Sequence, residues 1–530
     1  MTSVDEPGGR GTPGGRSALR EHLEVERTYV LPPGEPFPDL SGTEGVGGVG
    51  AERVLRLDAV YWDTSDLRLA ARGVRLRRRT GGTDAGWHVK MPTADGVVEV
   101  HAPVGRTEVV PRELAALVRA VTRGAPLASV ARLRTRRREL DLLDTHGAVV
   151  AVVADDDVSG RTLPAAPDGG QRLLRWRELE VELSDGSSEH GGELLDAVES
   201  RLRAAGASPS DSPSKVGKTL ADDVPPVWPS SPVVSSARSR AGDVLTAYVR
   251  TQVDAIVSLD PLVRRDAEDA LHRMRVATRR LRSALRSYSA LLDRSVTDPL
   301  ADRLRELAAV LGGARDGEVL RARILTALSD VPSEMVVGPV AERIGRSLGD
   351  DLSRAQGDVL TALDSADHAE LLDRLVELAS SLPWADPRAA RRRAGKVLPP
   401  AVERAHRRVR RDLKAAGGSG VREDRDLALH EARKAAKRVR YAAEVLVPAQ
   451  GKSAERVARR AEKVQAVLGE HQDAVVARGV LLQLGAAAHE AGESAFTYGV
   501  LAQRELERAE LAEGEVAAAA RRLARAVERL

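Results

Sequence analysis

The chain has 530 residues, of which 42 % are hydrophobic and only 2 % aromatic, a length that is too great for one core and predicts two or three domains. It carries 81 Lys and Arg residues against 78 Asp and Glu residues and has no Cys, which excludes disulfides and thiolate metal sites. No apolar run approaches the roughly 20 residues of a membrane span, and the N-terminus lacks the apolar stretch of a signal peptide. These features predict a cytoplasmic protein.

The first half of the chain is dominated by strand patterns. Residues 1–16 are rich in Gly and Pro and are expected to form a disordered tail. Strands are expected over 23–31, 59–62, 74–79, 86–91, 97–101, 132–143, 148–154 and 175–183, and helices over 112–121 and 192–205. This pattern predicts an α+β domain over 17–222, followed by a Pro- and Ser-rich linker over 223–236.

The second half, 237–530, predicts an all-α domain of long amphipathic helices. They are expected near 238–259, 263–292, 297–328, 335–365, 368–382, 387–416, 424–447, 452–485 and 491–529. Pro399 and Pro400 are expected to break or kink one of them.

This half also contains an internal repeat. The motifs His272-x-x-Arg275 and Leu311-Gly312 with Asp316 return as His430-x-x-Arg433 and Leu468-Gly469 with Asp473. The repeat predicts two pseudo-symmetric helical bundles, over about 237–380 and 387–530, with their basic faces lining one shared groove.

Each repeat carries a row of basic residues at helical spacing. The first row is His272, Arg275, Arg279, Arg282 and Arg286, and the second is His430, Arg433, Lys437 and Arg440, with Glu444 in the last place. The shared offsets place each row within an arc of about 80° over about 21 Å of helix, where like charges repel. A solvated face paired with neighbouring acids is the alternative interpretation, but the recurrence of the spacing favours a bound polyanion. Stacking aromatics are scarce nearby, so inorganic polyphosphate is favoured over a specific nucleic acid, and no membrane partner is expected.

Strand alternation in the first half places like charges on one face. The rows are Glu24, Glu26 and Thr28; Arg75, Arg77 and Arg79; His88 and Lys90; Arg134, Arg136 and Arg138; and Glu178, Glu180 and Glu182. These rows form either a charged outer surface or, if the sheet closes into a barrel, a charged interior. In a closed barrel, acids can hold Mg²⁺ or Mn²⁺ while cations hold phosphate.

Four stretches of the second half, at 272–288, 311–320, 430–444 and 468–476, resemble a CHAD domain, a helical domain that binds polyphosphate. The resemblance implies that the motif cations face the phosphate chain. They are His272, Arg275, Arg279, Arg282, His430, Arg433, Lys434, Lys437 and Arg440. Asp316 and Asp473 match the family's Asp and are expected to orient the arginines.

The first half resembles a CYTH domain, the triphosphate tunnel metalloenzyme fold, in stretches that include EVERT (24–28), WHVK (87–90), ELEVEL (178–183) and SKVGK (214–218). The resemblance implies an antiparallel eight-stranded β-barrel that binds triphosphate in its tunnel. It implies metal ligation by Glu24, Glu26, Asp156, Glu180 and Glu182, and phosphate binding by Arg77, Arg79, Lys90, Arg136, Lys215 and Lys218. Glu24, Glu26 and Lys90 are the implied catalytic residues, and the last two lysines are expected on a helix that closes one tunnel mouth.

Two departures from the CYTH pattern leave the activity open: Thr28 stands in place of the signature Lys, and Val97 in place of an Arg. One hypothesis is a Mg²⁺- or Mn²⁺-dependent triphosphatase acting on triphosphate or short polyphosphate. The other is a non-catalytic binding protein that is associated with polyphosphate. Association with polyphosphate granules in the cytoplasm is compatible with both. Adenylate cyclase and thiamine triphosphatase activities are not favoured, because nothing in the sequence indicates an adenine pocket or a thiazolium-stacking residue.

Overall fold

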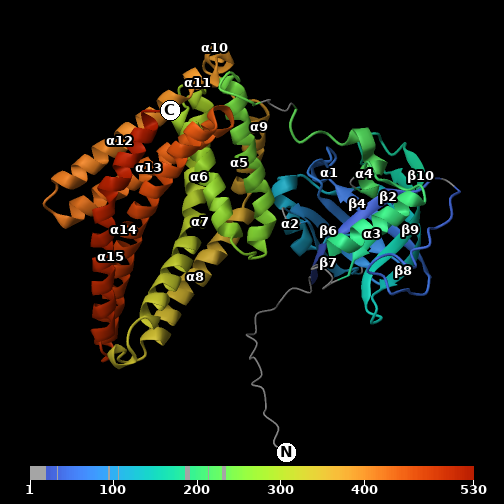
Figure 1. The fold of residues 1–530 in the computed structure, drawn as a ribbon, viewed down its shortest axis with the longest axis horizontal. Helices are drawn as coiled ribbons and strands as arrows, with labels where there is room; N and C mark the ends of the chain where they lie inside the picture. The colour runs from blue at the N-terminus through green and yellow to red at the C-terminus, as the bar shows by residue number, and fades with distance from the viewer. Residues whose placement is uncertain are drawn as a thin grey trace, which may run out of the picture. The chain divides into compact units, whose positions relative to one another are not determined.

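The structure is a computed structural model that describes residues 20–32, 34–93, 96–105, 107–184, 191–212, 214–229 and 234–530. The chain divides into two compact units, Met1–Val227 and Trp228–Leu530, and each is described by itself (Figure 1). The predicted tail over 1–16 lies outside the described residues. None of the described helices has the length and apolar character needed to cross a bilayer.

The first unit is built on one antiparallel sheet. Its strands are β1 (Arg20–Glu24), β2 (Glu26–Val30), β3 (Gly48–Val49), β4 (Arg53–Asp63), β5 (Arg75–Thr80), β6 (Gly86–Thr93), β7 (Gly96–Pro103), β8 (Ala128–Leu143), β9 (Val149–Thr162), β10 (Leu173–Leu183) and β11 (Ser208–Pro209). Neighbouring strands follow the order β1-β7-β6-β5-β4-β8-β9-β10-β2-β11, with β3 paired to β8.

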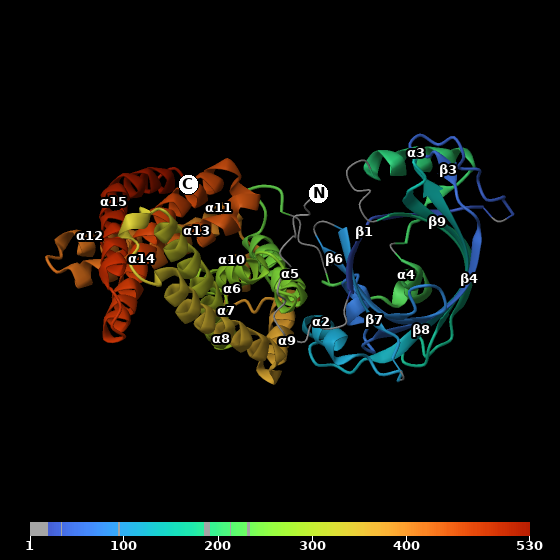
Figure 2. The ribbon, with the colours of Figure 1, turned by 90° about the horizontal axis from the view of Figure 1, so that it is seen from below.

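The sheet closes on itself at its N-terminal segment. The segment predicted as a single strand over 23–31 is divided at Val25 into β1, which pairs with β7, and β2, which pairs with β10. The backbone at Val25 remains bonded to the sheet, because the carbonyl of Val25 accepts a hydrogen bond from the amide of Leu183 in β10 at 3.0 Å. Consecutive residues therefore join β1, at one end of the strand order, to β2, which lies next to β11 at the other end. The sheet forms a ring around α4 (Lys215–Leu220) (Figure 2).

Helices cover part of the outside of this barrel and fill part of its inside. The helix α3 (Gly191–Ala204) packs Val198 against Tyr29 and Val181 on the outer face of β2 and β10. Inside, α4 packs Val216 against Leu133 of β8. The helices α1 (Arg68–Ala71) and α2 (Arg112–Thr122) complete the unit. Because apolar residues of β2 and β10 face α3, the alternate residues of those strands point into the barrel.

The second unit is helical throughout its described residues. Its helices are α5 (Ala241–Arg264), α6 (Ala270–Ser287), α7 (Arg294–Ser329), α8 (Val340–Asp364), α9 (Ala366–Ser380), α10 (Pro387–Arg391), α11 (Ala394–Val397), α12 (Pro399–Gly418), α13 (Arg422–Gln450), α14 (Lys452–Glu490) and α15 (Phe496–Val527). The predicted break at Pro399 and Pro400 is confirmed, since α12 begins at these prolines, where no intrahelical N–H is required.

The two basic helices, α6 and α13, pack against each other. Tyr288, at the end of α6, donates its hydroxyl to the carbonyl of Ala442 in α13 at 2.8 Å. Arg280 of α6 forms a two-pronged pair with Glu444 of α13, with N–O distances of 2.8 and 3.2 Å. The predicted fold class, an antiparallel barrel followed by an all-α domain, is confirmed.

Candidate functional site

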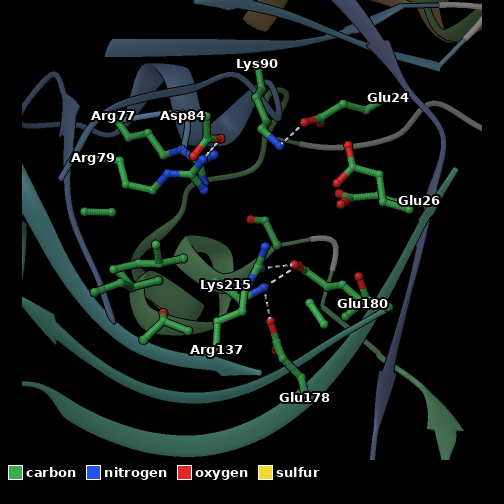
Figure 3. A pocket seen from close by; sticks show the side chains of 18 of the residues that line it. Glu24, Glu26, Arg77, Arg79, Asp84, Lys90, Arg137, Glu178, Glu180 and Lys215 are labelled. Atoms are coloured by element: carbon green, nitrogen blue, oxygen red, sulfur yellow. Dashed lines mark hydrogen bonds and ion pairs between the residues drawn. The ribbon is translucent and has the colours of Figure 1, made fainter. Parts of the chain in front are cut away.

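The barrel encloses a cavity of about 310 Å³ lined by charged side chains (Figure 3). Eight acidic residues line it: Glu24, Glu26, Asp84, Glu99, Glu139, Glu178, Glu180 and Glu182. Seven basic residues line it: Arg53, Arg75, Arg77, Arg79, Lys90, Arg137 and Lys215. The charged rows of β2, β5 and β10 therefore face inward, while Tyr29 and Val181 of the same strands face the α3 core.

One wall of the cavity, from β1, β2 and β10, presents carboxylates. Glu24 binds Lys90 through one oxygen, and its buried Oε2 has no hydrogen-bond partner. Burial, together with the neighbouring carboxyl of Glu99, raises the pKa of Glu24 to about 8. Glu26 lies directly across from Glu182 in the β2–β10 register, and burial raises the pKa of Glu182, with the charge of Glu26 adding to the effect.

Two internal cations, Lys215 and Arg137, neutralise buried carboxylates of β9 and β10. Lys215 of α4 pairs with Asp156 at 3.0 Å and Glu178 at 2.9 Å, and it also contacts Glu180. Arg137 of β8 reaches Asp156 at 2.7 Å and Glu180 at 2.6 Å. Burial opposes ionisation of Glu180, but Lys215 and Arg137 outweigh it and hold its pKa below the usual range.

The arginines of β5 differ in how far they are already neutralised. Arg79 is buried and paired with Asp84 from the loop between β5 and β6. Arg77 lies 3.6 Å from Glu99 of β7. Arg75 forms no ion pair within the described part of the chain and remains available to an anion in the cavity.

Two predicted phosphate-binding residues do not line the cavity. Arg136 is exposed on the outer face of β8, because the alternate residues of that strand, which include Thr135 and Arg137, point inward. Lys218 lies one turn after Lys215 on α4 and points outside the cavity lining, where its Nζ sits 5.3 Å from the ring centre of Trp176.

Sequence reasoning also missed several residues that line the cavity, among them Arg137, Glu99 and Asp84. Arg137 lies in the run RTRRR (134–138), in which no apolar residue indicates which face of the strand is turned inward. Glu99 had a usable signal, because it alternates with Val98 and Val100 on β7. Asp84 had none, since it reaches Arg79 from a loop.

The carboxylate wall fits a divalent cation that is shared with a ligand. Glu24 has an unpartnered oxygen and Glu26 forms no ion pair among the described residues. Asp156 and Glu180 of the predicted metal set are instead paired with Lys215 and Arg137. No three carboxylates or imidazoles in the described ranges converge as a ready metal site. Mg²⁺ is often held by one or two carboxylates together with substrate phosphates, which this wall suits.

In the helical unit, the two predicted basic rows converge. Lys437 of α13 lies within electrostatic reach of Arg433 on its own helix and of Arg275 and Arg279 on α6. Burial and these guanidinium groups lower the pKa of Lys437 to about 7. Neither Arg279 nor Lys437 forms an ion pair with any described carboxylate. We call Arg275, Arg279, Arg433 and Lys437 the cation cluster.

The repeated Leu-Gly motif positions the outer arginines of this cluster. Gly312 and Gly469 lie beneath Arg275 and Arg433, because a Cβ at these glycines would meet the guanidinium nitrogens at 3.5 and 3.2 Å. One turn later, Asp316 binds Arg275 in a two-pronged pair at 2.7 and 3.0 Å. The second copy is looser, with Asp473 at 3.9 Å from Arg433.

The remaining row residues fall into two groups. Arg282 forms no ion pair in the described structure, and His272 and His430 are partly buried, so that desolvation lowers the pKa of each imidazole. Three others are neutralised: Arg286 by Asp298 and Asp302, Lys434 by Glu431, and Arg440 by Glu444 and Glu462.

Comparisons with known proteins agree with both parts of the chain. A CYTH domain model matches residues 22–213, and a CHAD domain model matches residues 247–482. The uncharacterized proteins MT2285 and Rv2226 of Mycobacterium tuberculosis are each 38 % identical over 520 residues, which is 96 % of this chain and 98 % of theirs.

Solved structures also match the chain, among them the following two. PptA from Streptomyces chartreusis is 24 % identical, with 53 % of this chain and 99 % of that chain covered and a TM-score of 0.45. The CHAD domain from the plant Ricinus communis is 24 % identical, with 55 % and 94 % covered and a TM-score of 0.42.

Proposed function

The chain belongs to the family of proteins that carry a CYTH domain followed by a CHAD domain, and we propose that it binds inorganic polyphosphate through its helical unit and hydrolyses triphosphate or short polyphosphate in its barrel. The domain pair itself gives a function related to polyphosphate or triphosphate. The chain-specific part of the proposal rests on how each site distributes its charges.

The cation cluster is the single observation that carries polyphosphate binding. Four cations from α6 and α13 share one region, and Arg279 and Lys437 at its centre have no described carboxylate to neutralise them. Such an arrangement lowers stability unless an anion compensates it. Guanidinium groups give forked donors for phosphate oxygens, and the ammonium group adds a point charge.

In the barrel cavity, by contrast with the cation cluster, acidic residues outnumber basic residues, eight to seven. A free triphosphate would enter a cavity whose basic residues are matched by acidic ones, so little positive charge is left to balance it, and a divalent cation would supply that charge. Glu24 and Glu26 are the proposed ligands of this cation, with Glu182 beside them. When bound, Mg²⁺ or Mn²⁺ polarises a phosphoryl group and can activate water.

The cations of the barrel have the complementary role of holding the phosphate chain. Arg75 and Arg77 offer donors to phosphate oxygens, while Lys90 orients Glu24 and stabilises its charged form. Asp84 forms an ion pair with the guanidinium of Arg79 until a phosphate displaces it. Hydrolysis transfers one phosphoryl group to water and leaves inorganic phosphate and a shorter chain.

A second candidate is a barrel that binds triphosphate without turnover. Thr28 lines the cavity where the family signature has Lys, opposite Glu180 in the β2–β10 register. Lys215, Arg79 and Arg137 are already paired with carboxylates, which weakens their hold on the charge of a transferring phosphoryl group.

Phosphate release from tripolyphosphate by the full chain, with and without Mg²⁺ or Mn²⁺, separates the two candidates. Hydrolysis predicts metal-dependent release that is lost in Glu26→Gln and kept in Glu113→Gln, an exposed acid on α2. Binding without release would leave the barrel as a binding module. For the helical unit, Arg279→Glu with Lys437→Glu should abolish most polyphosphate binding at unchanged helicity, and unaltered affinity would refute the cluster.

A further inference from the structure

The helix α12 carries a second set of cations that neither basic row includes. Six of its residues are exposed and basic: Arg404, Arg407, Arg408, Arg410, Arg411 and Lys414. Only Arg411 forms an ion pair with a described carboxylate, the neighbouring Asp412 at 2.8 Å. The helix thus presents six exposed cations to solvent, while its own acids are only Glu403 and Asp412.

Packing of α12 does not require these charges. The helix is anchored by a stripe that includes Val402, Ala405 and Val409, all buried against the rest of the unit. On the flank of this stripe, Arg404, Arg408 and Arg411 follow offsets of 0, 4 and 7, so they form a row on one side of the helix. Repulsion along that row opposes helix stability, as it does in α6 and α13.

The α12 row is continuous with the cation cluster. Arg404 donates from Nη2 to the carbonyl of Ser287, the last residue of α6, at 3.4 Å. Arg408 and Arg411 lie within electrostatic reach of the exposed Arg438 on α13. Arg438 in turn lies within reach of Arg282, the unpaired cation one turn beyond Arg279 in the first row.

We propose that a long polyphosphate chain bound at the cation cluster continues past Arg282 and Arg438 onto α12, where Arg404, Arg408 and Arg411 form an extension site. This inference rests on the proposed polyphosphate binding and adds a site that only long chains reach. A polymer of identical charged units suits this row of cations, because each cation can contact a phosphate whatever the register of the chain along the row. Nucleic acid is less suited, since α12 has no Phe, Tyr or Trp to stack a base.

The test compares long and short polyphosphate fractions binding to the full chain. In Arg408→Gln with Arg411→Gln, affinity for long chains should fall about tenfold, and its dependence on salt should become shallower because fewer phosphates are neutralised. Affinity for short chains, which the cation cluster accommodates alone, should stay the same. The matched control is Arg346→Gln with Arg354→Gln, two exposed arginines of α8 that already pair with Glu342 and Asp351.

The variants distinguish the extension site on α12 from the proposed polyphosphate binding at the cation cluster. Retained long-chain affinity in the α12 variant, with loss in Arg279→Glu and Lys437→Glu, would overturn the extension site alone. No loss in the cluster variant would overturn polyphosphate binding itself. Loss of duplex DNA binding in place of long-chain affinity would show that α12 serves a nucleic acid. Arg408→Lys with Arg411→Lys should retain long-chain binding, which a folding defect would not allow.

Discussion

Arg136 and Arg137 are consecutive in β8, yet their side chains lie on opposite faces of the barrel wall. Arg136 is exposed outside, across from Arg56 of β4, whereas Arg137 binds Asp156 and Glu180 inside. Asp156 is fully buried, so its charge depends on Arg137 and Lys215 for compensation.

Substitutions at these two positions should therefore differ sharply in their effect on stability. Arg137→Gln leaves buried carboxylates short of a cation and should lower the free energy of unfolding by about 3 kcal/mol. Arg136→Gln, the matched control, should change it by less than about 0.5 kcal/mol. Urea unfolding of the full chain measures both, and equal effects would contradict the assigned faces of β8.

Asp84 should act as an internal competitor for phosphate. It reaches Arg79 from the β5–β6 loop and is itself 53 % exposed on its side chain, so the pair is partly screened by solvent. In Asp84→Asn the guanidinium is released, and affinity for Mg²⁺–tripolyphosphate should rise about fivefold. Asp157→Asn, an exposed acid on the outer face of β9, should leave affinity unchanged in the same titration. A weaker affinity in Asp84→Asn would mean that Asp84 supports the site.

Gly469 should separate stability from binding. Ala at this helical position favours the helix by up to about 1 kcal/mol, but its Cβ would lie 3.2 Å from Nη2 of Arg433 and displace the guanidinium. Gly469→Ala should therefore keep or raise the melting temperature while weakening polyphosphate binding. Gly479→Ala on the same helix, with no atom within 4 Å of the added Cβ, provides the control. If Gly469→Ala bound polyphosphate as tightly as the unmodified protein, the position of the Arg433 guanidinium over Gly469 would not matter for binding.

Lys437 should make polyphosphate binding dependent on pH. Its pKa in the free protein is lowered from 10.5 to about 7 by burial and by Arg433, Arg279 and Arg275, against a smaller opposite effect of Asp316. A bound polyanion favours the charged ammonium and raises this pKa. Below pH 7 the group is already charged, and affinity should not depend on it.

Above about pH 7, binding must take up a proton, and affinity should fall as pH rises, by at most tenfold per pH unit. Calorimetry in two buffers of different ionisation enthalpy measures the proton uptake directly. Lys437→Gln should remove the uptake and most of the slope between about pH 7 and pH 9. A slope that persists in this variant would assign the titration to another group.

The sequence predicted the barrel interior where apolar residues marked one face of a strand. Tyr29 in β2 and Leu179 with Val181 in β10 marked one face of each strand as apolar, so Glu26 and Glu180 were assigned to the other face, which the structure turns into the barrel. In β8 no apolar residue lies between Thr135 and Leu140, so the charged run itself did not show whether Arg136 or Arg137 faces inward.

Non-local geometry accounts for the other differences. Lys215 and Lys218 share a helix, but whether both face the cavity depends on how α4 sits within the ring, and only Lys215 does. In the helical unit the convergence of Arg279 with Lys437 followed from the repeat, because equivalent faces of paired helices meet. The cations of α12 lie outside the two basic rows, so the repeat of those rows gave no signal for them.

The junction at Val25 constrains the order in which the chain can fold. Residues 26–30 must find β10, about 150 positions later, before the ring is complete, whereas α12 to α15 each pack against the next helix in sequence. Contacts of such long sequence separation form slowly, and local helical contacts form quickly. During synthesis β2 must therefore wait without its β10 partner until residue 183 has emerged, which makes the barrel the slower and more aggregation-prone half of the molecule.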